Sequence, residues 1–148
     1  MAIIINSMKP QRAPLVLLAV LVVAFVGVVG WMRPRLVSVS PAPGAQDLPA
    51  GTLLQLTFSQ PMETETIESR LIISPTREGK FTWRGNSLTF TPDQPWPNGA
   101  LIQVRLEAGG RSATWLPLAH AEKREWSFTV EEPIILYLFP ANSPANLY

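Results

Sequence analysis

Cysteine is absent from the sequence, and histidine occurs once, as His120. Without cysteine the chain has no disulfide, no thiolate metal ligand and no cysteine nucleophile. A single histidine argues against a zinc site built from several imidazoles and against a Ser-His-Asp triad. We interpret His120 as a loop histidine. The sequence also lacks a phosphate-binding glycine-rich loop and a nucleophile elbow, so we expect no catalytic residues, no cofactor and no metal.

Net charge is small as well, and it is unevenly distributed. The 12 basic and 11 acidic residues give a formal net charge of +1, whereas a nucleic-acid-binding protein would show a basic surplus. Up to Arg35 the chain carries four basic residues and no acidic one; from Leu36 onward the balance is −3. We therefore do not expect nucleic acid as a partner. Because the sequence also lacks a catalytic or ligand-binding motif, we expect no small-molecule substrate either.

One long apolar run, from Leu15 to Gly30, contains no polar side chain. Together with its neighbours it extends over residues 13–32, about twenty residues, which is enough to cross a bilayer. In lipid a lone span must form its hydrogen bonds internally, so it must be helical. The sequence predicts a basic N-terminal tail over residues 1–12 and a transmembrane helix over residues 13–32.

A cleaved secretory signal peptide is the alternative interpretation of this run, because Val28 and Gly30 form a weak cleavage site. The run is long for a signal peptide, which favours a retained anchor. We expect a cytoplasmic N terminus and a following domain on the extracytoplasmic side, in the periplasm or outside the cell. Trp31, Arg33 and Arg35 are predicted to lie at the membrane interface on that side.

After Arg35 apolar and polar residues alternate, and a spacing of two is typical of β-strands. With a short strand at 71–74, about seven strands are predicted, as in an immunoglobulin-like sandwich over residues 36–131. The pair Gly85-Asn86 predicts a two-residue hairpin turn, and Trp96 is expected to plug one end of the sandwich. The alternating residues predicted to face the core are Val37, Val39, Leu54, Leu56, Phe58, Phe81, Trp83, Leu88, Phe90, Ile102, Val104, Leu106, Trp126, Phe128 and Val130.

Short segments spread over residues 35–130 follow one family pattern. They are PAPGA at 41–45, LP at 48–49, LTFSQPM at 56–62, GKFTW at 79–83, LTFTP at 88–92, WPNG at 96–99 and WSFTV at 126–130. As a set they resemble the bacterial Ig-like domains that occur as repeats in S-layer and other cell-surface proteins. The resemblance implies a β-sandwich that serves as a spacer or interaction module, and it carries no catalytic residues with it.

An apolar extension over residues 132–148 follows the predicted domain, and it is similar to the first strands of a β-propeller blade. A propeller needs several blades, so we expect either a truncated relative of such a protein or another use of the segment. An exposed apolar strand is adhesive. Ile135, Leu136, Tyr137 and Phe139 are therefore candidate partner-binding residues.

Two further groups of residues are candidates for sites. Trp115, Leu116 and Leu118 lie in a connection without strand pattern. Packing into the core is the slightly favoured interpretation, and the alternative is an exposed patch for a partner or the bilayer surface. The acidic residues between 63 and 68 could bind calcium, but the absence of an Asp-rich loop favours a solvated turn or short helix.

These features favour a non-catalytic, single-pass accessory or structural subunit of a larger bacterial membrane complex, with an extracytoplasmic Ig-like domain that contacts other proteins. The alternative is a membrane-anchored adhesion or spacer module at the cell surface or in the periplasm that acts independently. A third hypothesis is an enzyme or sensor whose propeller has been lost. Integral membrane subunits and the lipid bilayer are the expected partners.

Overall fold

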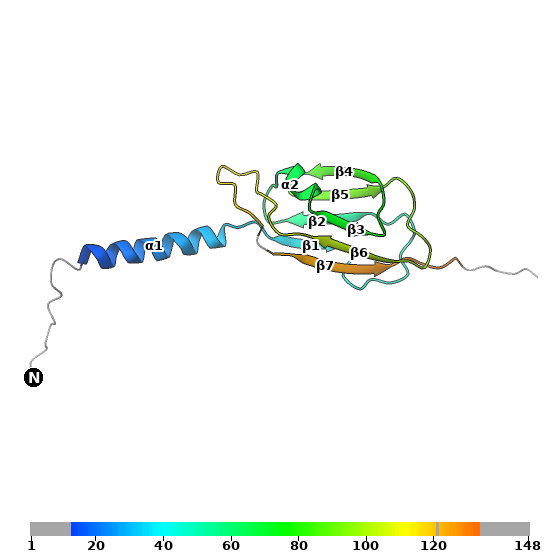
Figure 1. Ribbon diagram of the computed structural model, residues 1–148, viewed down its shortest axis with the longest axis horizontal. Helices are drawn as coiled ribbons and strands as arrows, with labels where there is room; N and C mark the ends of the chain where they lie inside the picture. Colours follow the sequence, from blue (N-terminus) through cyan, green and yellow to red (C-terminus); the bar gives the residue numbers. More distant parts are fainter. Residues whose placement is uncertain (1–12, 121, 134–148) are drawn as a thin grey trace, which may run out of the picture.

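The computed structural model describes residues 13–120 and 122–133 (Figure 1). The candidate residues Ile135, Leu136, Tyr137 and Phe139 lie outside the described residues, as does the basic tail over 1–12. The elements in chain order are α1 (Ala13–Trp31), β1 (Leu36–Ser40), β2 (Leu54–Phe58), α2 (Thr64–Glu68), β3 (Leu71–Ser74), β4 (Gly79–Arg84), β5 (Ser87–Pro92), β6 (Leu101–Leu106) and β7 (Arg124–Thr129).

Helix α1 projects away from the rest of the chain as a single rod (Figure 1). Its stretch Pro14–Trp31 has a mean hydropathy of 2.7, and none of that stretch is buried inside the molecule. Leaving a large apolar side chain in water instead of burying it costs roughly 1.5–3 kcal/mol. By length and composition α1 can therefore cross a membrane, as a retained anchor or as a signal sequence would.

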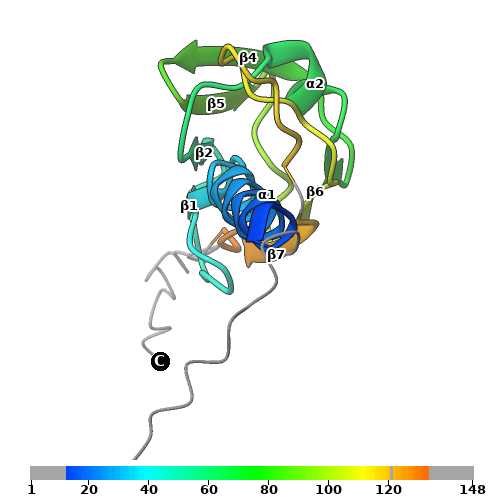
Figure 2. The same ribbon diagram turned by 90° about the vertical axis from the view of Figure 1, so that its left-hand side faces the viewer.

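The seven strands form two antiparallel sheets that pack face to face. One sheet has the order β1-β2-β5-β4 and the other the order β3-β6-β7. Figure 2, which looks along α1, displays the sheets as two layers. Buried apolar side chains from both sheets form one core cluster. The predicted fold class, one apolar helix followed by an Ig-like sandwich of seven strands, is confirmed.

Most residues predicted to face the core do so, because each strand turns alternate side chains to the same face. The fully or nearly fully buried ones are Leu54, Leu56, Phe58, Leu88, Phe90, Ile102, Val104, Leu106, Trp126, Phe128 and Val130. Val39, Phe81 and Trp83 are partly buried and pack against that cluster.

The prediction for Val37 is wrong, because its side chain is 66% exposed. The pairing of β1 with β2 contains a bulge between Leu36 and Ser38. An extra residue in one strand reverses the face that the following side chains occupy. Leu36 and Val39 therefore pack against the core, and Val37 points outward.

Helix α1 leaves from one end of the sandwich. We call this the helix-proximal end; it also holds the β4–β5 turn and the β6–β7 loop (residues 107–123) (Figure 1). Gly85 in the turn has φ +60°, as a primed hairpin turn requires, so the predicted turn is confirmed. At the far end Trp96 is 1% exposed, and its Nε1 donates a hydrogen bond to the carbonyl oxygen of Thr52 at 2.7 Å, which confirms the predicted plug.

Candidate functional site

Residues 32–35 join α1 to the sandwich, and hydrogen bonds hold this junction to the domain. The Gln60 side chain donates to the Met32 carbonyl oxygen at 3.1 Å. The Arg35 amide donates to Ser59 Oγ at 3.0 Å, and the Ser59 amide donates to the Arg35 carbonyl oxygen at 2.9 Å. Pro34 between them is buried. The junction is therefore part of the folded domain and not a free linker.

The three predicted interface residues lie together at this junction. Trp31 in the last turn of α1 is 79% exposed, and Arg33 and Arg35 are exposed beside it. None of the ion pairs among the described residues involves either arginine. Their contact with a membrane stays a prediction.

The β6–β7 loop folds back on itself as an irregular hairpin. The Gly109 amide donates to the His120 carbonyl oxygen at 2.8 Å, and the His120 amide donates to the Gly110 carbonyl oxygen at 2.7 Å. Further out, the Ser112 amide donates to the Leu118 carbonyl oxygen at 3.0 Å, and the Leu118 amide donates to Ser112 Oγ at 3.0 Å. Since Ser112 is completely buried, these bonds fix the position of the tip.

The tip of this loop carries the three candidate residues Trp115, Leu116 and Leu118, but it exposes them unequally. Trp115 is 86% exposed, more than any other large apolar residue among those described, whereas Leu116 and Leu118 are half-buried. Packing of Trp115 into the core, the interpretation that the sequence slightly favoured, is therefore wrong. The most exposed side chain of the loop tip is therefore the indole of Trp115.

His120 lies in the loop as predicted, and its side chain is buried beneath it, only 2% exposed. Its ring meets the Phe58 ring edge-on, with 6.3 Å between centroids. Burial lowers the pKa of His120, the charge of Glu122 opposes that effect and Arg124 adds to it. Among the described residues no group of three His, Asp or Glu side chains is placed to hold a metal ion. His120 thus serves packing at the base of the loop.

The acidic segment before β3 forms the short helix α2, which agrees with the expectation of a turn or short helix there. Ile67 in α2 is completely buried, and Glu68 accepts a hydrogen bond from Trp83 Nε1 at 2.8 Å. Glu68 therefore attaches α2 to β4, a contact that the sequence spacing alone does not indicate.

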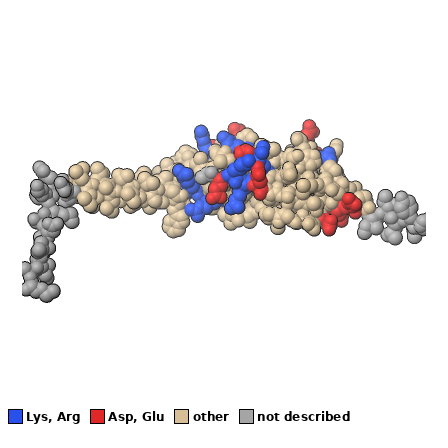
Figure 3. Space-filling view, turned by 60° about the horizontal axis from the view of Figure 1, so that its bottom comes forward, with Lys and Arg blue, Asp and Glu red and all other residues tan. Residues whose placement is uncertain are grey.

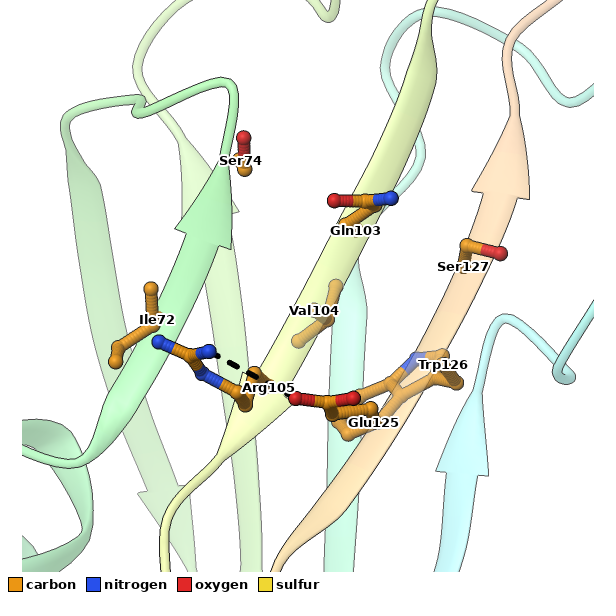
Figure 4. Close-up of a pocket in the computed structure, with 8 residues that line it drawn as sticks. All are labelled: Ile72, Ser74, Gln103, Val104, Arg105, Glu125, Trp126 and Ser127. Carbon is orange, nitrogen blue, oxygen red and sulfur yellow. Dashed lines mark ion pairs between the residues drawn. The ribbon is translucent and has the colours of Figure 1, made fainter.

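The outer face of the β3–β6–β7 sheet contains a shallow hollow of about 410 Å³ (Figure 4). We call it the outer-face hollow; its lining residues are Ile72, Ser74, Gln103, Val104, Arg105, Glu125, Trp126 and Ser127. Arg105 and Glu125 face each other across the strands, with 3.7 Å between Nη1 and Oε1. The hollow is open and is lined about equally by polar and apolar surface. It therefore suits contact with the surface of another protein better than enclosure of a small molecule.

Charged side chains border the outer-face hollow toward the helix-proximal end, where Figure 3 displays basic and acidic groups side by side. Lys123 Nζ lies 2.8 Å from Glu125 Oε1, and Arg105 Nε lies 3.0 Å from Glu107 Oε1. The hydrogen bond and charge of Lys123, with a smaller contribution from Arg105, lower the pKa of Glu125. These pairs present alternating charges at neutral pH, which can select a partner by charge complementarity.

The architecture defines a two-sheet immunoglobulin-like sandwich behind an apolar helix. The chain belongs to the bacterial Ig-like domain family, whose model matches residues 32–130. Members of this family are non-catalytic Ig-like domains. The match covers all seven strands and begins at the junction after α1. No curated protein matches the sequence.

Similar solved structures include two L,D-transpeptidases. The L,D-transpeptidase from Mycobacterium smegmatis is 21% identical, with a TM-score of 0.52 over 68% of this chain and 41% of that one. The LD transpeptidase LdtMt1 in complex with imipenem is 22% identical, with a TM-score of 0.51 over 66% and 40%. This chain thus spans about 40% of their length. At this identity the likeness concerns the fold alone.

The N-terminal part of the bacterial S-layer protein SbsC is also similar, at 19% identity over 75% of this chain and 26% of that one. Its TM-score of 0.46 is too low to add to the assignment of the fold.

Proposed function

We propose that this protein is a single-pass membrane protein in which α1 is a retained anchor and the Ig-like domain binds other proteins on the extracytoplasmic side without catalysing a reaction. The apolar surface of α1 supports the anchor, because none of the stretch Pro14–Trp31 is buried inside the molecule. Membership of a non-catalytic family supports a binding role for the domain. The basic N-terminal tail is proposed to stay in the cytoplasm.

The observation that carries this proposal further is the short, hydrogen-bonded junction of residues 32–35. A strand of six residues is about 20 Å long, so a domain joined so closely to α1 reaches only tens of ångströms from the bilayer. Proteins within that reach are integral membrane proteins or proteins bound at the same surface. We therefore favour an accessory subunit of a larger membrane complex over a spacer or adhesion module, which would need a longer reach.

Co-purification from the native membrane tests this proposal. The full chain, with a tag after Tyr148, is extracted in a mild detergent and isolated, and its companions are identified. We expect a stoichiometric set of integral membrane proteins that survives washing. Recovery of the chain alone, as a small particle, would reject the accessory subunit in favour of the independent module.

A pair of variants tests whether the outer-face hollow is the docking surface. Ile72 is 43% exposed in the hollow, and Thr82 is exposed on the outer face of the other sheet. Ile72→Asp introduces a charge into the proposed contact, so co-purification should fall, while Thr82→Asp introduces the same charge elsewhere and should leave it unchanged. Equal behaviour of the two variants would remove the hollow from the proposal.

A further inference from the structure

We infer that the tip of the β6–β7 loop is a second membrane contact, in which Trp115 lies among the lipid headgroups beside the point where α1 leaves the bilayer. This inference rests on the proposed role of α1 as an anchor. It assigns the exposed indole to the lipid surface and not to a protein partner.

The first observation in favour of a membrane contact is the position of the β6–β7 loop relative to α1. The loop extends from the helix-proximal end back along the direction of α1 and reaches the level of the last helical turn (Figure 1). In the view along α1 it comes forward on the same side of the domain as the helix (Figure 2). A cavity of about 190 Å³, lined by Gly30, Arg33 and His120 among others, lies between the end of α1 and the base of the loop. If α1 spans the bilayer, the tip lies at the bilayer surface.

The second step is that hydrogen bonds hold the loop in this position. At its base the Glu63 amide donates to the Arg111 carbonyl oxygen at 2.9 Å, and the Ala113 amide donates to the Pro61 carbonyl oxygen at 2.9 Å. The buried Ser112 hydroxyl accepts the Leu118 amide from inside the hairpin. The segment at 61–63 directly follows Gln60, whose side chain donates to the carbonyl oxygen of Met32, the first residue after α1. One continuous set of bonds thus links the loop to the helix.

The third step is chemical. An indole combines an apolar ring with an N–H donor, and tryptophan is therefore enriched at membrane interfaces. Trp115 is 86% exposed and Trp31 is 79% exposed, so two such rings face outward at the same end of the molecule. Arg33 and Arg35 follow Trp31 in the junction, and Arg111 lies in the β6–β7 loop before the tip. All three are exposed and lie outside the ion pairs of the described residues. Guanidinium groups near the surface are attracted to anionic lipid phosphates. These neighbours favour lipid as the occupant.

Quenching of tryptophan fluorescence by brominated lipids tests the inference on the full chain. The protein is reconstituted into vesicles of phosphatidylcholine and phosphatidylglycerol in equal amounts, with bromine on the upper part of the acyl chains in both leaflets. Trp31→Phe leaves Trp115 as the highly exposed indole, and Trp115→Phe leaves Trp31. The double variant measures the background from the remaining tryptophans. Both positions are exposed, so neither change should disturb folding.

We expect brominated vesicles to reduce the emission of the Trp31→Phe variant clearly more than that of the double variant, with emission shifted to shorter wavelength. If brominated vesicles reduce the emission of Trp31→Phe and of the double variant equally, but reduce that of Trp115→Phe more, the inference is overturned. Helix α1 would then remain an anchor, and Trp115 would be available to a protein partner. Equal loss in all three would overturn both the inference and the proposed anchor.

Discussion

Trp96 and Trp115 are the same residue type in contrasting surroundings. Trp96 is 1% exposed, contacts the rings of Phe90 and Phe128, and donates its hydrogen bond to Thr52. Trp115 is 86% exposed on the β6–β7 loop. Burial and a satisfied N–H contribute to stability only at the former position. We therefore expect Trp96 to contribute to the stability of the fold and Trp115 to contribute to contacts at the surface.

The first prediction compares the same substitution at these two positions. Trp96→Phe removes the hydrogen bond to Thr52 and leaves a gap at the far end, so the free energy of unfolding should fall by about 2 kcal/mol. Trp115→Phe should change it by less than about 0.5 kcal/mol. Urea unfolding of the full chain in detergent micelles, followed by circular dichroism, measures both. Equal losses would contradict the assignment of Trp96 to the core.

The second prediction concerns pH and His120. Burial lowers the pKa of this imidazole below its ordinary value of 6.5, so the unfolded chain binds more protons than the folded chain as the pH falls below that value. The contribution of His120 to stability is therefore present above pH 6.5 and is lost as the pH falls toward the folded pKa. The slope for one group cannot exceed about 1.4 kcal/mol per pH unit.

His120→Asn, which has no titrating side chain, provides the control for this effect. Urea unfolding is repeated at intervals between pH 7.5 and pH 5 for both proteins. The wild type should lose stability in the part of this range below pH 6.5, and the variant should lose less there. Identical pH dependence in the two proteins would show that His120 does not titrate differently on folding.

At the scale of elements, the strands were predictable because each has one face in the core. Apolar residues therefore alternate with polar ones along its sequence. The outward orientation of Val37 was not predictable, because it depends on a bulge in the pairing of β1 with β2. Its local sequence contains the same alternation as the other strands. The hydrogen bond from Trp83 to Glu68 was missed for the same reason, since it joins elements that only the folded chain brings together.

The candidate site was predictable only in part. The apolar character of Trp115 and its place outside a strand were visible in the sequence, but its exposure depends on the hairpin bonds around Ser112. The outer-face hollow combines residues from β3, β6 and β7, and their order in the sheet is not encoded in spacing. The sequence did indicate which residues of β6 face outward, because Gln103 and Arg105 alternate with core residues of that strand.

The third prediction addresses α1 as an element. A lysine at the centre of a membrane-spanning helix costs roughly 2.5–3.5 kcal/mol on insertion scales. Val22→Lys should therefore reduce the fraction of the chain that resists extraction from membranes at alkaline pH. Val37→Lys, at a similarly exposed valine on β1, is the matched control and should leave the fraction unchanged. Equal extraction of both variants and the wild type would contradict the role of α1 as an anchor.

At the scale of the whole molecule, chemical character changes along its length. An apolar rod is followed by an end with exposed arginines, then by a sheet surface of mixed charge, and Figure 3 displays acidic groups at the far end. Glu131 and Glu132, both exposed, follow β7 there. This arrangement gives the domain one end suited to a lipid surface and one that faces away from it. The bonded junction keeps that orientation.

The fourth prediction therefore concerns the junction as a whole. Insertion of a flexible Gly-Ser segment after Arg33 should leave α1 in the membrane but release the domain from it, because the link between Met32 and Gln60 no longer orients the sandwich. Co-purification of membrane partners and quenching of Trp115 by brominated lipids should both fall. The same insertion after Gln94, in an exposed far-end loop, is the control and should preserve both.

The central claim, a retained anchor with the Ig-like domain outside, is tested most directly by labelling single cysteines, since the natural chain has none. Ser7→Cys lies before α1 and Asn98→Cys lies in an exposed turn of the domain. In intact spheroplasts a membrane-impermeant maleimide should label the Asn98→Cys chain, which stays with the membrane, and should label the Ser7→Cys chain only after permeabilisation. Labelling of Ser7→Cys in intact spheroplasts, or release of the domain into the medium, would contradict the account.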